Sequence, residues 1–126
     1  YLSEFSHDNE KINRIIDAFP EELQNQVRNQ LATVLKGVIS QRLLPKLSGG
    51  RTAAVEILVI NSAVKNAIRD DKVYQIDNII QTGAEQGMIT MENYLVNLVK
   101  SGEISLETAK AFSNKKEEIE SMMNKV

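Results

Sequence analysis

The sequence predicts an α+β fold that is mostly helical and contains one antiparallel β-hairpin. Apolar residues recur at spacings of three and four through most of the chain, which is the helical period. The period changes on both sides of a Ser-Gly-Gly turn at 48–50, where runs rich in branched residues indicate a hairpin. A chain of 126 residues is long enough to bury one core. We therefore expect a single module over residues 1–126, with the hairpin at 38–60 and a helical cluster at 61–126.

Composition excludes several classes of protein. The net charge of −2 argues against a nucleic-acid partner, and the absence of cysteine excludes disulfides and thiolate metal sites. No apolar run approaches the ~20 residues needed to cross a bilayer, and no signal peptide begins the chain. We therefore expect a cytoplasmic protein. The chain begins with Tyr1 rather than Met, so we expect it to be processed, trimmed or part of a longer protein.

Two helices are predicted before the hairpin. Asp8 or Asn9 can cap the first helix, and Pro20 ends it because proline disfavours helical geometry in the residue before it. Pro20 also opens the second helix, which ends near Gly37. The apolar stripe of the first helix is Ile12, Ile15, Ile16 and Phe19, and that of the second is Leu23, Val27, Leu31, Val34 and Leu35.

The hairpin strands are predicted at Val38–Leu47 and Thr52–Ile60. The segment Val55–Ile60 is apolar on both faces, and such a strand is normally covered on both faces. Two strands do not make a stable sheet by themselves. Either helices of this chain cover both faces or a larger sheet is missing, and we favour the second alternative.

The remainder of the chain is predicted to be helical. Asn61 or Ser62 caps a short helix, Thr90 caps a longer one, and Ser105 caps another that runs to about Phe112. Between the first two of these helices an apolar stripe closes near Gly83. The Lys/Glu-rich tail from residue 113 is either a helix packed along one edge or frayed.

No catalytic or cofactor-binding residue is predicted. The motif G-x-x-x-x-G-K-[ST], which cradles phosphates, does not occur, and Gly49-Gly50 fits a hairpin turn. This chain alone should therefore not hydrolyse ATP. His7 is the single histidine, and beside Asp8 and Glu4 it makes a weak start for a metal site. We expect no metal site and a solvated His7.

Five stretches carry a family resemblance in their order along the chain. They are INRIIDAFP at 12–20, GVISQRLLP at 37–45, AAVEIL at 53–58, AVKNAIRD at 63–70 and QTGAEQGMITME at 81–92. In this order they resemble the C-terminal part of a PilT-type ATPase, a secretion-superfamily motor that retracts type IV pili. The resemblance covers most of the chain, from Ile12 to about Gly102. It implies the C-terminal portion of a RecA-like, P-loop ATPase domain.

The resemblance also implies how the parent protein works. The parent would be a homo-hexamer that uses ATP and magnesium, lies in the cytoplasm at the inner membrane face and contacts a pilus membrane platform protein. This portion would couple ATP-driven motion to pilus disassembly and twitching motility. The alternative is a stand-alone helical docking or adaptor module derived from such an ATPase. Whether the parent is a retraction motor or a sister ATPase stays open.

Two groups of residues receive candidate roles from the resemblance. The stretch at 63–70 is similar to the family's A-I-R-N-L-I-R-E motif, which is needed for retraction, although residues 64, 65, 67 and 70 vary from it. It implies partner contacts by Ala63, Lys65, Asn66, Ile68 and Arg69. The family's His box precedes the first helix, and here either His7 is its remnant after a short deletion or Glu4 occupies its position.

Overall fold

The computed structural model describes residues 7–113 and 115–124. It confirms the predicted fold class, because the chain is mostly helical and its two strands form one antiparallel sheet. The elements in chain order are α1 (Asp8–Asp17), α2 (Glu21–Val34), β1 (Gly37–Pro45), β2 (Arg51–Val59), α3 (Ser62–Arg69), α4 (Ile76–Gln81), α5 (Met91–Lys100), α6 (Leu106–Phe112) and α7 (Lys116–Met123). Short 3-10 turns at Val73–Gln75 and Ala84–Gln86 precede and follow α4.

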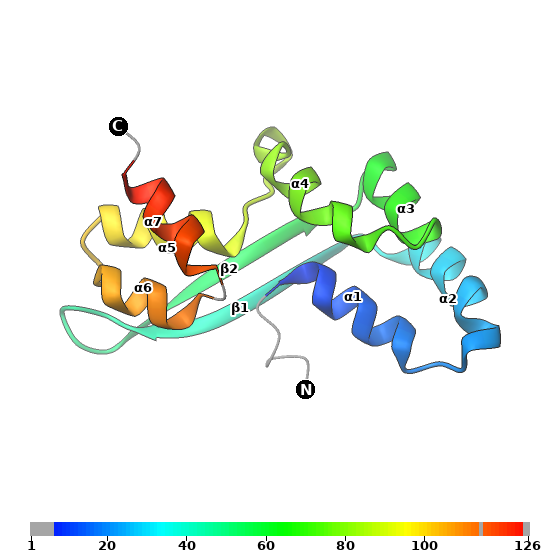
Figure 1. Cartoon of the computed structure of the whole chain (residues 1–126), viewed down its shortest axis with the longest axis horizontal. Helices are drawn as coiled ribbons and strands as arrows, with labels where there is room; N and C mark the ends of the chain where they lie inside the picture. The colour runs from blue at the N-terminus through cyan, green and yellow to red at the C-terminus, as the bar shows by residue number, and fades with distance from the viewer. Residues whose placement is uncertain (1–6, 114, 125–126) are drawn as a thin grey trace.

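The hairpin supports two groups of helices along its length. In Figure 1, α1 to α4 lie over one end of the hairpin, and α5 to α7 lie over the end that carries the turn. Each group has its own cluster of buried apolar residues, and β2 contributes Leu58 to the first cluster and Ala54 to the second. The core is therefore divided into two parts that share the hairpin.

The hairpin register follows from its turn. Gly49 and Gly50 both have positive φ, at 95° and 73°, where a side chain would be strained. The strands pair from Gly37 with Val59 to Pro45 with Arg51. Each strand therefore begins one residue before its predicted first residue and ends before its predicted last residue.

Helices of the described part of the chain cover one face of the hairpin. Ala54, Glu56 and Leu58 point inward from β2 and are fully buried. On the opposite face Ile39 and Leu43 are 62% and 52% exposed. Among the described residues the helices therefore cover one face of the hairpin, as expected if a larger sheet is missing, and that larger sheet stays a prediction.

The helix caps were predicted correctly where a side chain makes the cap. Asn61, Thr90 and Ser105 each accept a hydrogen bond from the backbone three residues later, at 3.0, 3.1 and 3.0 Å. The cap of α1 was predicted wrongly, because His7 occupies it with extended backbone and Asp8 is the first helical residue. None of the helices in the described ranges is long and apolar enough to cross a membrane.

The described part of the C-terminal tail contains a packed helix, α7. Ile119 of α7 is fully buried in the second apolar cluster, which also contains Leu95 of α5. This burial anchors α7 against α5, one of the two outcomes that the sequence left open.

Candidate functional site

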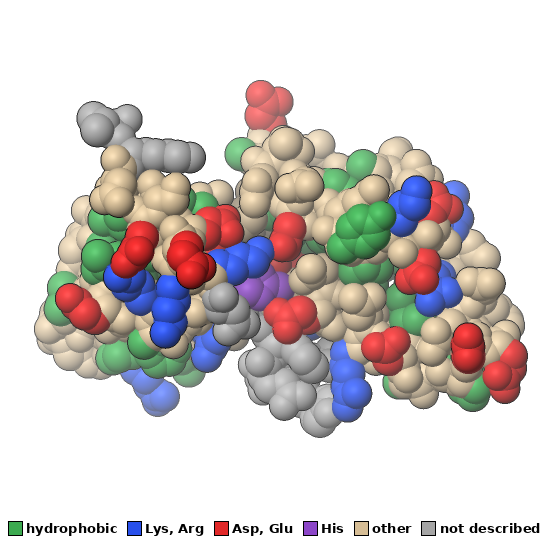
Figure 2. Space-filling view, viewed as in Figure 1, with side chains coloured by type: hydrophobic (Ala, Val, Ile, Leu, Met, Phe, Trp, Pro, Cys, Tyr) green, Lys and Arg blue, Asp and Glu red, His purple; other side chains and the backbone are tan. Residues whose placement is uncertain are grey.

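A buried polar junction lies between the two apolar clusters. It contains His7 and Asp8 at the start of α1, Ser40 of β1, Glu56 of β2 and Glu92 of α5, all of which are buried. Figure 2 shows the histidine between the two halves of the molecule, with acidic and basic side chains beside it. Buried ionisable groups are rare unless they are paired, so their partners define the site.

Glu56 holds the first turns of two helices with one carboxylate. Its Oε2 accepts a hydrogen bond from the backbone N–H of Asp8 at 2.7 Å, and its Oε1 accepts one from Met91 at 3.0 Å. These amides begin α1 and α5, where the N–H groups have no partner within the helix and the helix dipole favours negative charge. Burial raises the pKa of Glu56, although both amides act to lower it.

His7 links α5 to the start of α1. Its Nδ1 lies 2.9 Å from Oε1 of Glu10, and its Nε2 lies 3.3 and 3.2 Å from the two carboxylate oxygens of Glu92. The hydrogen bond to Glu92 raises the pKa of His7 to about 9, against the opposing effect of burial. Burial raises the pKa of Glu92, but the hydrogen bond and charge of His7 outweigh it and lower the pKa overall.

Asp8 adds a further buried carboxyl group. The hydroxyl of Ser40 donates to Oδ1 of Asp8 at 2.5 Å, whereas the buried Oδ2 has no hydrogen-bond partner among the described residues. Burial raises the pKa of Asp8 to about 7, with the charge of Glu56 acting in the same direction. The junction is therefore rich in carboxyl oxygens.

Two further contacts close the junction on the side of α7. The hydroxyl of Ser113 donates to Oε2 of Glu92 at 3.2 Å. The ammonium group of Lys115 lies 2.7 Å from Oδ2 of Asp77 in α4, so this ion pair also joins the two halves. Burial lowers the pKa of Lys115, but the hydrogen bond and charge of Asp77 outweigh it and raise the pKa overall.

The junction contains a set of possible metal ligands. One ligand atom each from His7, Glu56 and Glu92 lies within 4.8 Å of the others, and all three residues are buried. The expectation of a solvated His7 is wrong, since its exposed fraction is 4%. Sequence reasoning missed the group because 85 positions separate His7 from Glu92. The sequence did contain one signal of this group. Glu56 is an acidic residue at an inward position of an otherwise apolar strand.

The residues proposed for partner contact lie on α3. Ala63, Asn66 and Arg69 are exposed and Lys65 is half-buried. Ile68 is fully buried in the first apolar cluster, so it supports the helix from inside, and its assignment as a contact residue is corrected. Glu4, the alternative occupant of the His-box position, lies outside the described residues.

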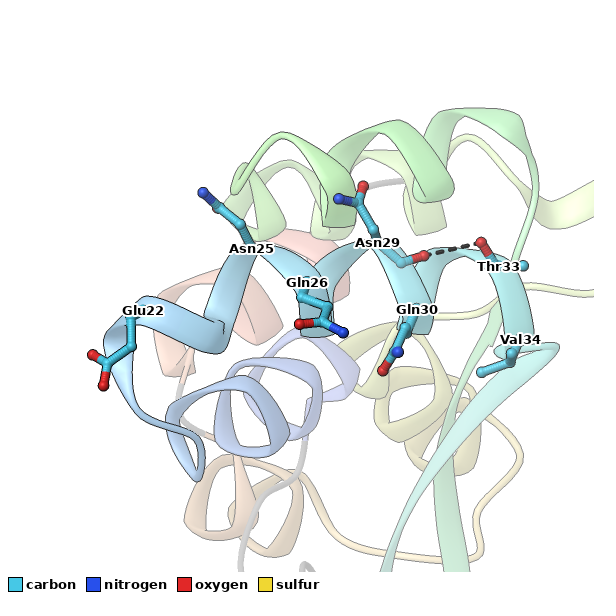
Figure 3. Close-up of a pocket in the computed structure, with 7 residues that line it drawn as sticks. All are labelled: Glu22, Asn25, Gln26, Asn29, Gln30, Thr33 and Val34. Atoms are coloured by element: carbon cyan, nitrogen blue, oxygen red, sulfur yellow. Dashed lines mark hydrogen bonds between the residues drawn. The ribbon is translucent and has the colours of Figure 1, made fainter.

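One face of α2 forms an open, shallow surface. Figure 3 shows its lining residues, Glu22, Asn25, Gln26, Asn29, Gln30, Thr33 and Val34. The hydroxyl of Thr33 donates to the backbone carbonyl of Asn29 at 2.9 Å, so it is engaged within the helix. The lining consists of amides, one carboxylate, one hydroxyl and one valine, and the hydroxyl of Thr33 is not paired with a base.

The fold itself defines a class of protein. The X-ray structure of the Legionella pneumophila ATPase DotB matches with a TM-score of 0.68 and 20% identity, over 85% of this chain and 29% of that chain. At this identity the match shows the shared fold alone, which is the fold of part of that ATPase. No protein-family model matches the sequence.

More similar proteins narrow the class to one family. The crystal structure of the pilus retraction motor PilT with bound ADP matches with a TM-score of 0.81 and 43% identity, over 90% of this chain and 32% of that chain. The type IV pilus retraction ATPase PilT of Pseudomonas aeruginosa is 46% identical over 99 residues, which are 79% of this chain and 29% of the relative. A twitching motility protein of Neisseria gonorrhoeae is 45% identical over 100 residues, covering 79% of this chain and 27% of the relative.

The resemblance predicted from the sequence is thereby confirmed. The chain is a homologue of the PilT-type ATPases and corresponds to their C-terminal part. It spans less than a third of the length of these curated relatives.

Proposed function

We propose that this chain is the C-terminal portion of a type IV pilus retraction ATPase, which couples ATP-driven motion to pilus disassembly and twitching motility. The observation that carries the proposal is the 46% identity to a pilus retraction ATPase over 79% of the chain. The relatives with this similarity are named as a pilus retraction ATPase and a twitching motility protein, which favours the motor over a stand-alone adaptor.

We propose that the whole protein uses ATP and magnesium, as the ADP in the structure of the related motor suggests. The residues described for this chain do not fit the phosphate groups of a nucleotide. Gly49 and Gly50 join two strands, whereas a phosphate-binding loop leads from a strand into a helix. The chain therefore supplies motion coupling rather than hydrolysis, and we expect no ATP turnover from it alone.

The exposed side of α3 is the proposed contact surface. Lys65, Asn66 and Arg69 present polar groups there. The buried side chain of Ile68 packs in the first apolar cluster and holds the helix in place. The partner would be the pilus membrane platform protein or a neighbouring subunit of a homo-hexamer at the cytoplasmic face of the inner membrane.

The test changes Arg69→Ala in the full-length motor. Removing an exposed guanidinium should leave folding and assembly intact, while losing a partner contact should impair retraction. Twitching is measured in cells that carry the variant as their retraction motor, and assembly is measured on the purified protein. Arg51→Ala, an exposed arginine beside the hairpin turn, is the matched control and should retain motility. Normal twitching by the Arg69 variant, or loss of its assembly, would refute the contact role.

A further inference from the structure

We propose that His7, Glu56 and Glu92 form a binding site for one divalent transition-metal ion of the Zn²⁺ type. The ion would join the residue before α1 to β2 and α5. The three ligand atoms lie within 4.8 Å of one another and come from three separate segments of the chain. This site is independent of the proposed contact surface on α3.

The distances between His7 and Glu92 suit a shared ion. Nε2 of His7 is nearly equidistant from the two oxygens of Glu92, at 3.3 and 3.2 Å. Without an ion this contact is a hydrogen bond shared between two oxygens, and each branch is longer than the about 2.7–2.9 Å of a single charge-assisted hydrogen bond. Two ligand atoms at this separation, each about 2.1 Å from a metal ion, subtend an angle of about 100° at the ion, which is close to tetrahedral.

Each proposed ligand is held by a second hydrogen bond. Glu10 accepts from Nδ1 of His7 at 2.9 Å, which fixes the tautomer and directs Nε2 toward Glu92. Ser113 donates to Glu92, and two backbone amides donate to Glu56, leaving further lone pairs on those oxygens. A carboxylate behind a ligating histidine is the usual outer shell of a zinc site.

Charge and ligand type favour a transition metal. The ion would take the place of the Nε2 proton of His7, and the neutral imidazole and two carboxylates that remain carry a charge of about −2, which a divalent ion neutralises. Asp8 lies beside the group with a buried carboxyl oxygen that has no hydrogen-bond partner in the described part of the chain. Magnesium and calcium prefer oxygen ligands alone, whereas imidazole with carboxylate suits zinc.

The chain offers a direct test because it has one histidine and no cysteine. Tag-free protein is loaded with one equivalent of Zn²⁺, and X-ray absorption at the zinc edge reports the ligands. Scattering from one imidazole can come from His7 alone, and the remaining ligands should be oxygen. A spectrum with no imidazole contribution overturns the proposal.

Affinity for Zn²⁺ is measured by calorimetry on the wild type and on matched variants. Glu92→Gln should abolish the tight site, and Glu10→Gln should weaken it by about 10–100-fold because it removes the outer-shell partner. Glu103→Gln, an exposed acidic residue, should bind like the wild type. Circular dichroism checks that each variant folds. Unchanged affinity in a folded Glu92 variant overturns the proposal, and if that variant does not fold, the absorption experiment on the wild type decides alone.

Discussion

Glu56 lies between Ala54 and Leu58 on the inward face of β2, and each of these two apolar neighbours belongs to a different apolar cluster. Its carboxylate occupies the gap between the clusters and accepts the first amide hydrogens of α1 and α5. A carboxylate that accepts from helix N-termini is stabilised by both the hydrogen bonds and the helix dipoles. One residue thus fixes where two helices begin relative to the strand.

Changing Glu56→Gln should destabilise the chain by about 1–3 kcal/mol, because the amide group can accept only one of the two hydrogen bonds and places a donor against the other N–H. The free energy of unfolding is measured with urea in the presence of a chelator, so that metal binding does not contribute. Glu85→Gln, at an exposed position, should change stability by less than about 0.5 kcal/mol. Equal stability of the two variants would show that the double cap contributes nothing.

The Asp77–Lys115 ion pair should give a pH-dependent contribution to stability. The pKa of Lys115 is raised in the folded chain, so the contribution is fully present below the unfolded pKa and is lost as pH rises through the folded one. The wild type should exceed Lys115→Met in stability at about pH 8, and the difference should shrink above about pH 10.5. The difference between the two unfolding free energies is measured across this range. If the difference in unfolding free energy grew as the pH rose, the predicted direction of the pH dependence would be wrong.

At the scale of elements, local sequence signals predicted most of the fold. The caps at Asn61, Thr90 and Ser105 and the hairpin turn depend on residues within a few positions, so spacing alone finds them. The junction depends on residues from distant segments, and no local pattern pairs them. The cap of α1 was predicted wrongly for the same reason, since the carboxylate that binds its first amide comes from β2.

Helix α3 has a buried side that stabilises the fold and an exposed side that is the proposed contact surface. Ile68→Ala should cost about 2–5 kcal/mol, because it removes a fully buried side chain and leaves a cavity in the first cluster. Arg69→Ala should cost less than about 0.5 kcal/mol, as expected of an exposed site. Thermal and urea unfolding of both variants of this chain measure the contrast. Melting of the domain by the Arg69 variant would show that this side chain is structural.

At the scale of the whole molecule, the sequence indicated that β2 is apolar on both faces but could not say which face this chain covers. Which face is covered depends on Glu56, Ser40 and the helices that contact them. Only the folded structure brings these residues together. The face that carries Ile39 and Leu43 is left exposed among the described residues. An exposed apolar strand face tends to associate with another chain.

The isolated chain should therefore self-associate through this face. Leu43→Glu places a charge in the middle of the exposed apolar surface, and the cost of burying that charge should shift the protein toward monomer. Sedimentation velocity over a wide range of concentration measures the distribution of species for the wild type and the variant. Val34→Glu is the matched control, because Val34 is an exposed apolar residue at the end of α2, outside the two strands of the hairpin. It should associate like the wild type. A wild-type chain that remains monomeric at every concentration, or a control that dissociates as readily as the Leu43 variant, would rule out this face as the association surface.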